Sequence, residues 1–310
     1  MFKNVFNIFE AVEDGTVDDV RSFIEQGADV NTKDDYYETP LLFFAVKSNS
    51  LDVIRYLIEQ GADINVTADS GCTVLHYATF NNVEVLKYLI EQGMDVNIGN
   101  LQNWTPLHFA AGRSGNVDMV KHLIEKGADV NAKADLGWTP VHSAASYSYN
   151  DSCGDILKRL VDAGANITAK TDHDMTVLHF AASNDGDVGV LEYLFAQGMD
   201  VNAKDSDSMT PLHCCVGKYS ANLDVLKYLI AQGADVNAKD NCGRTPLYCW
   251  LSYNGNDSTD DRIDDVITIS NCLIESGADV NVSITPLDLA IPDKLKTVIR
   301  AAGGKSGSEL

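Results

Sequence analysis

Five histidines recur along the chain, each at the fourth position of a Thr-Pro-Leu-His motif or a close variant of it. They are His76, His108, His142, His179 and His213. A series of imidazoles could bind metal, but the ligands of one zinc ion lie about 2 Å from it, whereas neighbouring packed helices lie about 8–10 Å apart. Because each histidine falls in a different repeat, we expect structural histidines, no metal site and no cofactor.

Three other patterns resemble catalytic or ligand-binding motifs without completing them. The segment Gly303-Gly-Lys-Ser306 lacks the glycine that a phosphate-binding loop needs five residues before Gly304, where Ile299 stands. The acidic segment 257–265 lacks the glycine and the closing glutamate of a calcium-binding loop. The seven cysteines have no metal-binding spacing and are expected to be buried hydrophobes. Nothing in the pattern suggests an enzyme.

Composition and charge restrict the partners. The 310 residues are 45% hydrophobic, and 23 Lys and Arg against 45 Asp and Glu give a net charge of −22. Such an acidic surface repels nucleic acid and anionic membranes. The odd number of cysteines, the absence of an N-terminal signal-peptide pattern and the lack of any long apolar run predict a cytoplasmic protein.

Two motifs repeat in phase. A Gly-Ala-Asp-Val-Asn pentapeptide or a relative of it recurs at intervals between 32 residues, from Gly61 to Gly93, and 44 residues, from Gly233 to Gly277. It begins at Gly27, Gly61, Gly93, Gly127, Gly164, Gly198, Gly233 and Gly277. The Thr-Pro-Leu-His motif begins at Thr39, Thr73, Thr105, Thr139, Thr176, Thr210, Thr245 and Thr285. This periodicity indicates a repeat architecture.

Each repeat predicts two helices and a hairpin. Threonine is a good N-cap and proline is favoured at the first helical position, so each Thr-Pro pair should open a short helix. A second helix is predicted by the apolar stripe of residues such as 51–60, and it should end at a glycine such as Gly61. The polar residues between the pentapeptide and the next threonine are typical of hairpin turns.

These motifs resemble the ankyrin repeat family over residues 4 to about 302. The resemblance implies an all-α fold with short β-hairpins, in which about nine units including caps stack into a solenoid. We expect an N-terminal cap at 1–34, seven internal repeats at 35–284, a C-terminal cap at 285–302 and a disordered tail at 303–310. The family also implies that the histidine bonds the backbone of the neighbouring turn.

In the resembling family, the residue before each threonine points from the hairpin into a concave groove. In this chain those positions hold Glu38, Cys72, Trp104, Trp138, Met175, Met209 and Arg244. Trp104, Trp138, Met175 and Met209 would form an apolar stripe on an acidic body, and Tyr36, Leu101, Leu136, Tyr147 and His173 are placed to flank it. The alternative is that the four large side chains fold back over neighbouring hairpins as packing.

We therefore predict a non-enzymatic, monomeric interaction scaffold that binds a partner protein or peptide on its concave face. An apolar segment flanked by Lys or Arg would suit this stripe, with Arg244 at its end. Proteins that resemble this chain act as adaptors, inhibitors and secreted effectors. The alternative function is an acidic decoy that occupies the nucleic-acid-binding site of another protein, and this binding would weaken with salt.

Overall fold

The computed structural model describes residues 7–309 except 81–82, 147–151, 184–185, 218–220, 255–259, 282–285, 287–288 and 290. Within these residues the chain forms seventeen α-helices and three isolated β-bridges, and no β-strand. The chain divides into two compact units, one of Met1–Ala144 with Asp155–Ala165 and one of Ala145–Gly154 with Asn166–Leu310. None of the described helices is long and apolar enough to cross a membrane.

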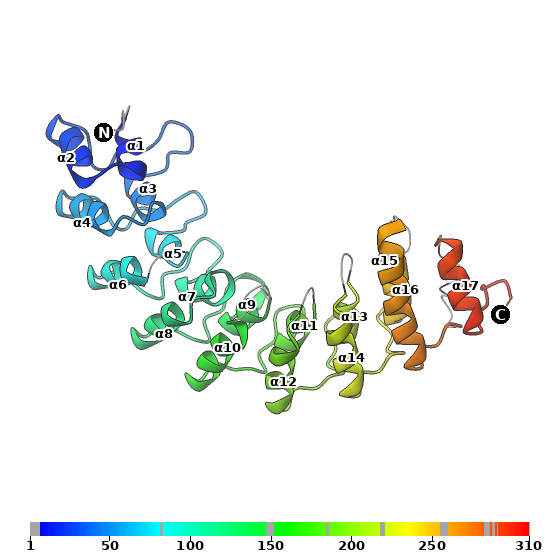
Figure 1. Ribbon diagram of the computed structural model, residues 1–310. Coiled ribbons are helices and arrows are strands. Elements are labelled where there is room, and N and C mark those ends of the chain that lie inside the picture. The colour runs from blue at the N-terminus through cyan, green and yellow to red at the C-terminus, as the bar shows by residue number, and fades with distance from the viewer. Residues whose placement is uncertain are drawn as a thin grey trace. The chain divides into compact units, whose positions relative to one another are not determined.

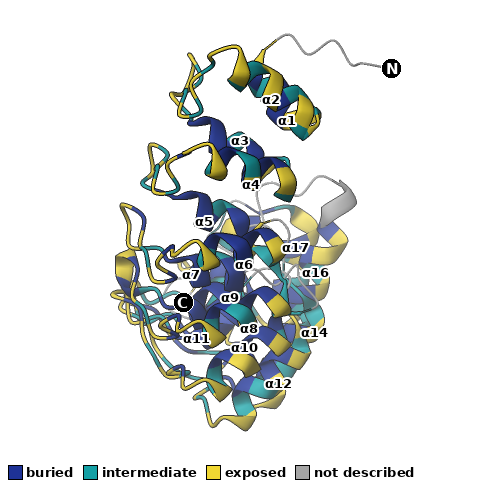
Figure 2. Cartoon of the chain, turned by 90° about the vertical axis from the view of Figure 1, so that its left-hand side faces the viewer, coloured by how far each residue is buried: buried dark blue, intermediate teal, exposed yellow. Residues whose placement is uncertain are grey.

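In the first unit, short helices pair in chain order (Figure 1). They are α1 (Ile8–Asp14), α2 (Val17–Glu25), α3 (Leu41–Lys47), α4 (Leu51–Glu59), α5 (Val74–Ala78), α6 (Val83–Glu91), α7 (Pro106–Phe109) and α8 (Val117–Glu125). A π-helical turn, Ala110–Ser114, continues α7. The buried faces of α3, α5 and α7 pack on one another, while the hairpin loops beside them are largely exposed (Figure 2).

The second unit repeats this arrangement. Its helices are α11 (Val177–Ala182), α12 (Val188–Ala196), α13 (Pro211–Cys215), α14 (Leu223–Ala231), α15 (Pro246–Asn254), α16 (Asp260–Glu275) and α17 (Asp293–Ala301). Helices α9 (Pro140–Ser146) and α10 (Cys153–Asp162) contain residues of both units. First helices pack on first helices, as α11 does on α13, and second helices on second helices, as α12 does on α14.

Among the motif helices whose N-caps the structure describes, the starts follow the sequence pattern except at the first motif. Thr73, Thr105, Thr176 and Thr210 are N-caps in extended conformation, as predicted. At the first motif, however, Pro40 is the N-cap of α3 and Thr39 lies outside the helix. The isolated bridges show the same shift, because Pro40 pairs with Lys33 where Thr73 pairs with Thr67. The first hairpin is therefore one residue longer than the hairpins closed by the Thr67–Thr73 and Lys170–Thr176 bridges.

This shift changes which residues are equivalent. Asp34 N–H bonds the carbonyl of Thr39, whereas Asn100 N–H bonds the carbonyl of Trp104. Thr39, and not Glu38, thus occupies the position of Trp104. Glu38 instead has a left-handed backbone, with φ of 48°.

The asparagine that ends the pentapeptide joins successive repeats. Its side-chain amide donates to the carbonyl of the glycine that opens the next pentapeptide, as Asn97 Nδ2 does to Gly127 O at 3.0 Å. Asn97 Oδ1 also accepts the N–H of Asp129 at 2.7 Å. The same amide-to-glycine bond is made by Asn31, Asn131, Asn202, Asn237 and Asn281. At residue 168 this asparagine is replaced by threonine.

The last asparagine of the series binds the segment after α17. Asn281 Nδ2 donates to Gly303 O at 2.9 Å, and Asn281 Oδ1 accepts the N–H of Lys305 at 2.7 Å. Gly303, with φ of 87°, thereby takes the place of a pentapeptide glycine. At residues 303–305 the end of α17 is thus bound in the same way as the end of an internal repeat. Disorder of the tail 303–310 stays a prediction.

Candidate functional site

The motif histidines are buried and bonded on both sides of the ring. His108 Nδ1 lies 3.1 Å from the N–H of Thr105, and His108 Nε2 lies 3.3 Å from the carbonyl oxygen of Trp138. Since a carbonyl can only accept, Nε2 carries the hydrogen and Nδ1 accepts from the N-cap backbone. His76, His179 and His213 make the same pair of contacts, to the carbonyls of Trp104, Met209 and Arg244. The histidine thus connects its helix cap to the next hairpin.

Burial keeps these imidazoles neutral. It lowers the pKa of His108 to about 4, and it also lowers the pKa values of His76, His179 and His213. The bond to a backbone carbonyl raises each pKa, but by less than burial lowers it. Over the part of the chain that is described, no three His, Cys, Asp or Glu side chains are grouped to hold a metal ion.

Part of the negative charge of the chain lies on aspartates that accept hydrogen bonds within their own turns. In seven pentapeptides the aspartate Oδ1 accepts the N–H of the residue two positions later, as Asp95 does from Asn97 at 2.8 Å. The others are Asp29, Asp63, Asp129, Asp200, Asp235 and Asp279. These carboxylates stabilise their own turns, so only the remaining acidic residues can be attributed to a partner.

Trp104 and Trp138 form a ring pair at the base of neighbouring hairpins in the first unit. Their ring centroids lie 5.6 Å apart with an interplanar angle of 43°. Each indole also contacts its own motif histidine, Trp104 at 5.3 Å from His108 and Trp138 at 6.3 Å from His142. Both tryptophans nevertheless remain partly exposed. They pack on the framework and present the rest of their surface to solvent.

Two phenylalanines extend this pair. Phe109 of α7 lies 6.2 Å from the Trp104 ring, and Phe80, in the loop after α5, lies 5.8 Å from Phe109 with 43% of its surface exposed. We call Phe80, Phe109, Trp104 and Trp138 the aromatic patch. Sequence reasoning missed both phenylalanines. A signal existed for Phe109, because the residue after the motif histidine is aromatic in three repeats, as Tyr77, Phe109 and Phe180.

The hairpin tips beside the patch carry exposed apolar side chains. Leu101 is 76% exposed and Leu136 is 55% exposed. Their tips are joined through backbone, because the Asp135 N–H bonds the carbonyl of Gln102 at 2.9 Å. Leu136 has φ of 60°, a left-handed conformation that is unfavourable for leucine. Tyr36, at the first hairpin tip, is 90% exposed.

The remaining predicted site residues lie in the second unit or outside the described residues. Met175 and Met209 are partly exposed, and the carbonyl of Met209 accepts a hydrogen bond from His179 Nε2. His173 is exposed at a hairpin tip. Arg244 is bound internally, because its Nε lies 2.7 Å from Oδ2 of the buried Asp240. Tyr147 lies outside the described residues. Of the predicted site residues that the structure describes, the two whose rings contact each other are Trp104 and Trp138 of the first unit.

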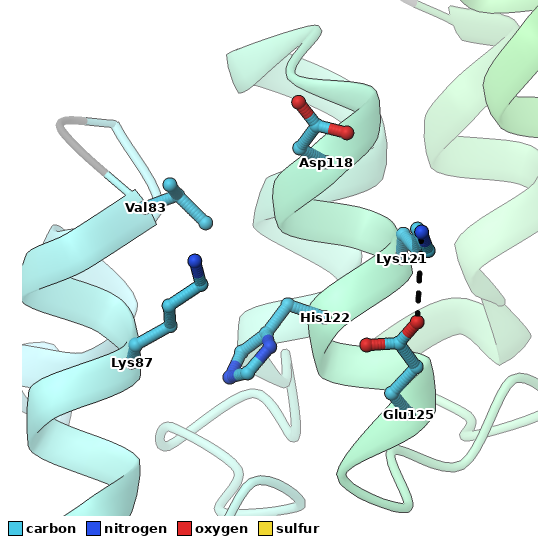
Figure 3. A pocket seen from close by; sticks show the side chains of 6 residues that line it. All are labelled: Val83, Lys87, Asp118, Lys121, His122 and Glu125. Carbon is cyan, nitrogen blue, oxygen red and sulfur yellow. Dashed lines mark ion pairs between the residues drawn. The ribbon is translucent and has the colours of Figure 1, made fainter.

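A small cavity lies in the first unit, between α6 and α8, the second helices of two successive repeats. It has a volume of about 180 Å³ and is lined by Val83, Lys87, Asp118, Lys121, His122 and Glu125 (Figure 3). One repeat earlier, at the equivalent positions, the Arg55 guanidinium lies 4.4 Å from the centroid of Tyr88. His122 stands where those repeats have tyrosine, and its Nε2 is buried without a hydrogen-bond partner. The cavity is the space that a smaller ring leaves.

Comparison with known proteins agrees with the geometry. The family model for ankyrin repeats (3 copies) matches residues 8–100, 97–171, 148–240 and 178–284. The chain therefore belongs to the ankyrin repeat family, whose members are generally protein–protein interaction modules. A search of curated proteins finds no significant match.

Proposed function

We propose that the protein is a non-enzymatic interaction scaffold that binds a partner protein or peptide through the hairpin side of its repeats, with the aromatic patch as the main contact. The observation that carries this proposal is the Trp104–Trp138 pair, whose ring centroids lie 5.6 Å apart and which remains partly exposed. Ordered, partly exposed tryptophans are enriched among the residues that dominate interface energies. Exposed Leu101 and Leu136 would enlarge the contact.

This proposal differs from the sequence-based prediction in how much each residue is expected to contribute to partner binding. Met175 and Met209 would contribute adaptable apolar contacts in the second unit. Arg244 would contribute least, since its guanidinium already pairs with Asp240. We also propose that about nine units, joined by short β-hairpins, stack into a solenoid whose hairpin side is concave.

A selection experiment tests the scaffold function. A phage-displayed random-peptide library would be panned against the full-length protein and against the Trp104→Ala, Trp138→Ala double variant. Loss of one such anchor typically costs about 2 kcal/mol or more, which corresponds to a roughly 30-fold weaker Kd. We expect selected peptides to bind the wild type and to lose at least that factor on the double variant.

A matched control separates a specific effect of the aromatic patch from the general effect of removing an aromatic side chain. Phe195 of α12 is also half-exposed and contacts Tyr228 with ring centroids 5.9 Å apart, but it lies on a second helix of the other unit. Phe195→Ala should leave peptide binding unchanged. Unaltered helicity, measured by circular dichroism, would confirm that all variants are folded. Peptides that bind wild type and double variant equally would contradict the proposed site.

Salt dependence distinguishes binding at the aromatic patch from the alternative function, an acidic decoy. Binding through exposed carboxylates should weaken strongly between about 50 and about 500 mM salt, whereas binding to the aromatic patch should largely persist. The engagement of seven aspartates in their own turns favours the patch.

We further propose that the chain acts as a monomer in the cytoplasm. All seven cysteines are free, and Cys215 and Cys249 are buried. Burial raises the pKa of Cys249 to about 11, so this thiol stays protonated and unreactive at neutral pH. Multi-angle light scattering of the reduced protein would test the monomer, and a mass of two chains would refute it.

A further inference from the structure

The first helices of the first unit carry a row of aromatic side chains. Helices α1, α3, α5 and α7 pack on one another in chain order (Figure 1). Each contributes one partly exposed aromatic residue, and we call these four residues the first-helix row: Phe9, Phe44, Tyr77 and Phe109. Phe44 is equivalent to Tyr77 because of the shift at the first motif, since each lies four residues after its N-cap, Pro40 or Thr73.

Contacts connect this row with the aromatic patch. The ring centroids of Phe9 and Phe44 lie 5.0 Å apart. Lys47 joins Phe44 to Tyr77, because its Nζ lies 5.8 Å from the centroid of each ring. Phe109 belongs to the row and to the patch, and its ring lies 5.4 Å from that of His76, the residue before Tyr77. The row therefore extends the patch towards the N-terminus.

The cation in this row has no anionic partner among the residues that the structure describes. Lys47 is the last residue of α3 and is exposed, and its only contacts of this kind are those with the two rings. Lys87 and Lys121 on the second helices, by contrast, lie 2.8 Å and 3.8 Å from glutamate oxygens. An unpaired ammonium thus lies on the aromatic row.

A partner that covers the row must also cover this ammonium. Removing water from a charged group is unfavourable unless another group compensates for the lost hydration. A carboxylate compensates well, because hydrogen bonds between ionised groups are roughly twice as strong as those between neutral groups. The rings on both sides of Lys47 require apolar contacts at the same time. The row therefore favours a carboxylate that is surrounded by apolar side chains.

We infer that the first-helix row binds a partner segment in which an Asp or Glu side chain lies between apolar residues. The carboxylate accepts hydrogen bonds from the Lys47 ammonium, while the apolar neighbours cover Phe44, Tyr77 and Phe109. Lys or Arg residues flank this core, because a chain with a net charge of −22 attracts a segment that is positive overall. The inference depends on the proposed function, since it specifies the segment that the row and the aromatic patch bind together.

Two matched peptide libraries test this inference. Both display random apolar residues around one fixed central residue, with lysines at each end, and the central residue is Glu in one library and Gln in the other. Both are panned against the full-length protein, and dissociation constants of the selected peptides are measured by fluorescence anisotropy. We expect Glu peptides to bind about 3- to 20-fold more tightly than the same peptides with Gln.

A double-mutant cycle identifies the cation. Lys47→Met keeps the length of the side chain and removes the ammonium, so it should weaken the Glu peptides by the same factor and leave the Gln peptides unchanged. Lys121→Met is the matched control, because this exposed lysine lies on the second helix α8, and it should leave both kinds of peptide unaffected. Circular dichroism would confirm that each variant is folded.

The outcomes separate the inference from the proposed function. Equal binding of Glu and Gln peptides, or Glu peptides that bind Lys47→Met as well as wild type, would overturn the carboxylate while leaving the scaffold function intact. Sensitivity to Lys47→Met without sensitivity to Trp104→Ala, Trp138→Ala would support the row and contradict the tryptophan pair as the main contact. If neither library returns a peptide, the inference and the proposed site are both wrong.

Discussion

Acid should destabilise this protein through its buried histidines, and His108 allows the size of the effect to be worked out. In the unfolded chain the imidazole binds a proton below its usual pKa of about 6.5, whereas in the folded protein its pKa is about 4. Between these values the proton binds the unfolded chain preferentially. Stability is therefore fully present above pH 6.5 and falls as the pH drops towards 4.

The magnitude follows from the size of this shift. Each pKa unit corresponds to about 1.36 kcal/mol, so lowering the pH from 7 to 5 should remove about 2 kcal/mol of unfolding free energy through His108 alone. The main structural cause is burial of the imidazole, which disfavours its charged form. A protonated Nδ1 could also no longer accept the N–H of Thr105, 3.1 Å away. His76, His179 and His213, whose pKa values are lowered for the same reason, act in the same direction.

Two measurements check this prediction. The ring-proton signal of His108, followed by nuclear magnetic resonance, should titrate well below pH 6. The unfolding free energy, measured by urea denaturation followed by tryptophan fluorescence, should fall from pH 7 to pH 5. This fall should be smaller by about 2 kcal/mol in His108→Gln. His173→Gln, at an exposed hairpin tip, is the matched control and should retain the full wild-type dependence.

The result that would refute this reasoning is a His108 titration near pH 6.5, or a His108→Gln variant with unchanged acid sensitivity. Because repeat arrays can unfold in steps, the comparison should use the same transition in each protein. A second, separate transition at low pH would assign the loss to another repeat.

Three further predictions concern the repeat framework, each checked by urea or thermal unfolding. His122→Tyr should fill the cavity beside Lys87 and restore a cation–π contact, raising stability by about 0.5–1 kcal/mol; a lower stability would mean that the space is too small for the ring. Leu136→Asn should stabilise by about 0.5–1 kcal/mol, because asparagine tolerates a left-handed backbone; no gain would show that the turn is unstrained. Asn97→Ala should cost about 1–3 kcal/mol through its two hydrogen bonds to the next repeat, and Asn65→Ala, which lacks the bond to the next glycine, should cost less.

The sequence determined the repeats because their signals are local. A threonine N-cap, a glycine after a helix and an apolar stripe act within one or two turns of chain, so Thr73, Thr105, Thr176 and Thr210 open helices where the motif predicts. The position before each threonine likewise marks Trp104 and Trp138 as candidates, because the resemblance to the family places this residue on the binding side. Membership of the ankyrin repeat family follows from these short-range patterns.

Only the tertiary structure decided which residues of different repeats and hairpin arms come into contact. Sequence spacing could not show that the first hairpin is one residue longer, because the pairing of Pro40 with Lys33 depends on the fold of both hairpin arms. Nor could it bring Phe80 to within 5.8 Å of Phe109, a residue of the next repeat.

The cavity beside His122 and the binding of Gly303 by Asn281 have the same origin. Each depends on the size or hydrogen-bonding groups of side chains that lie more than twenty residues apart in the chain and come together only when one repeat packs on the next. Local preferences fix the helices of each repeat, whereas packing between repeats fixes the surface that they present to a partner.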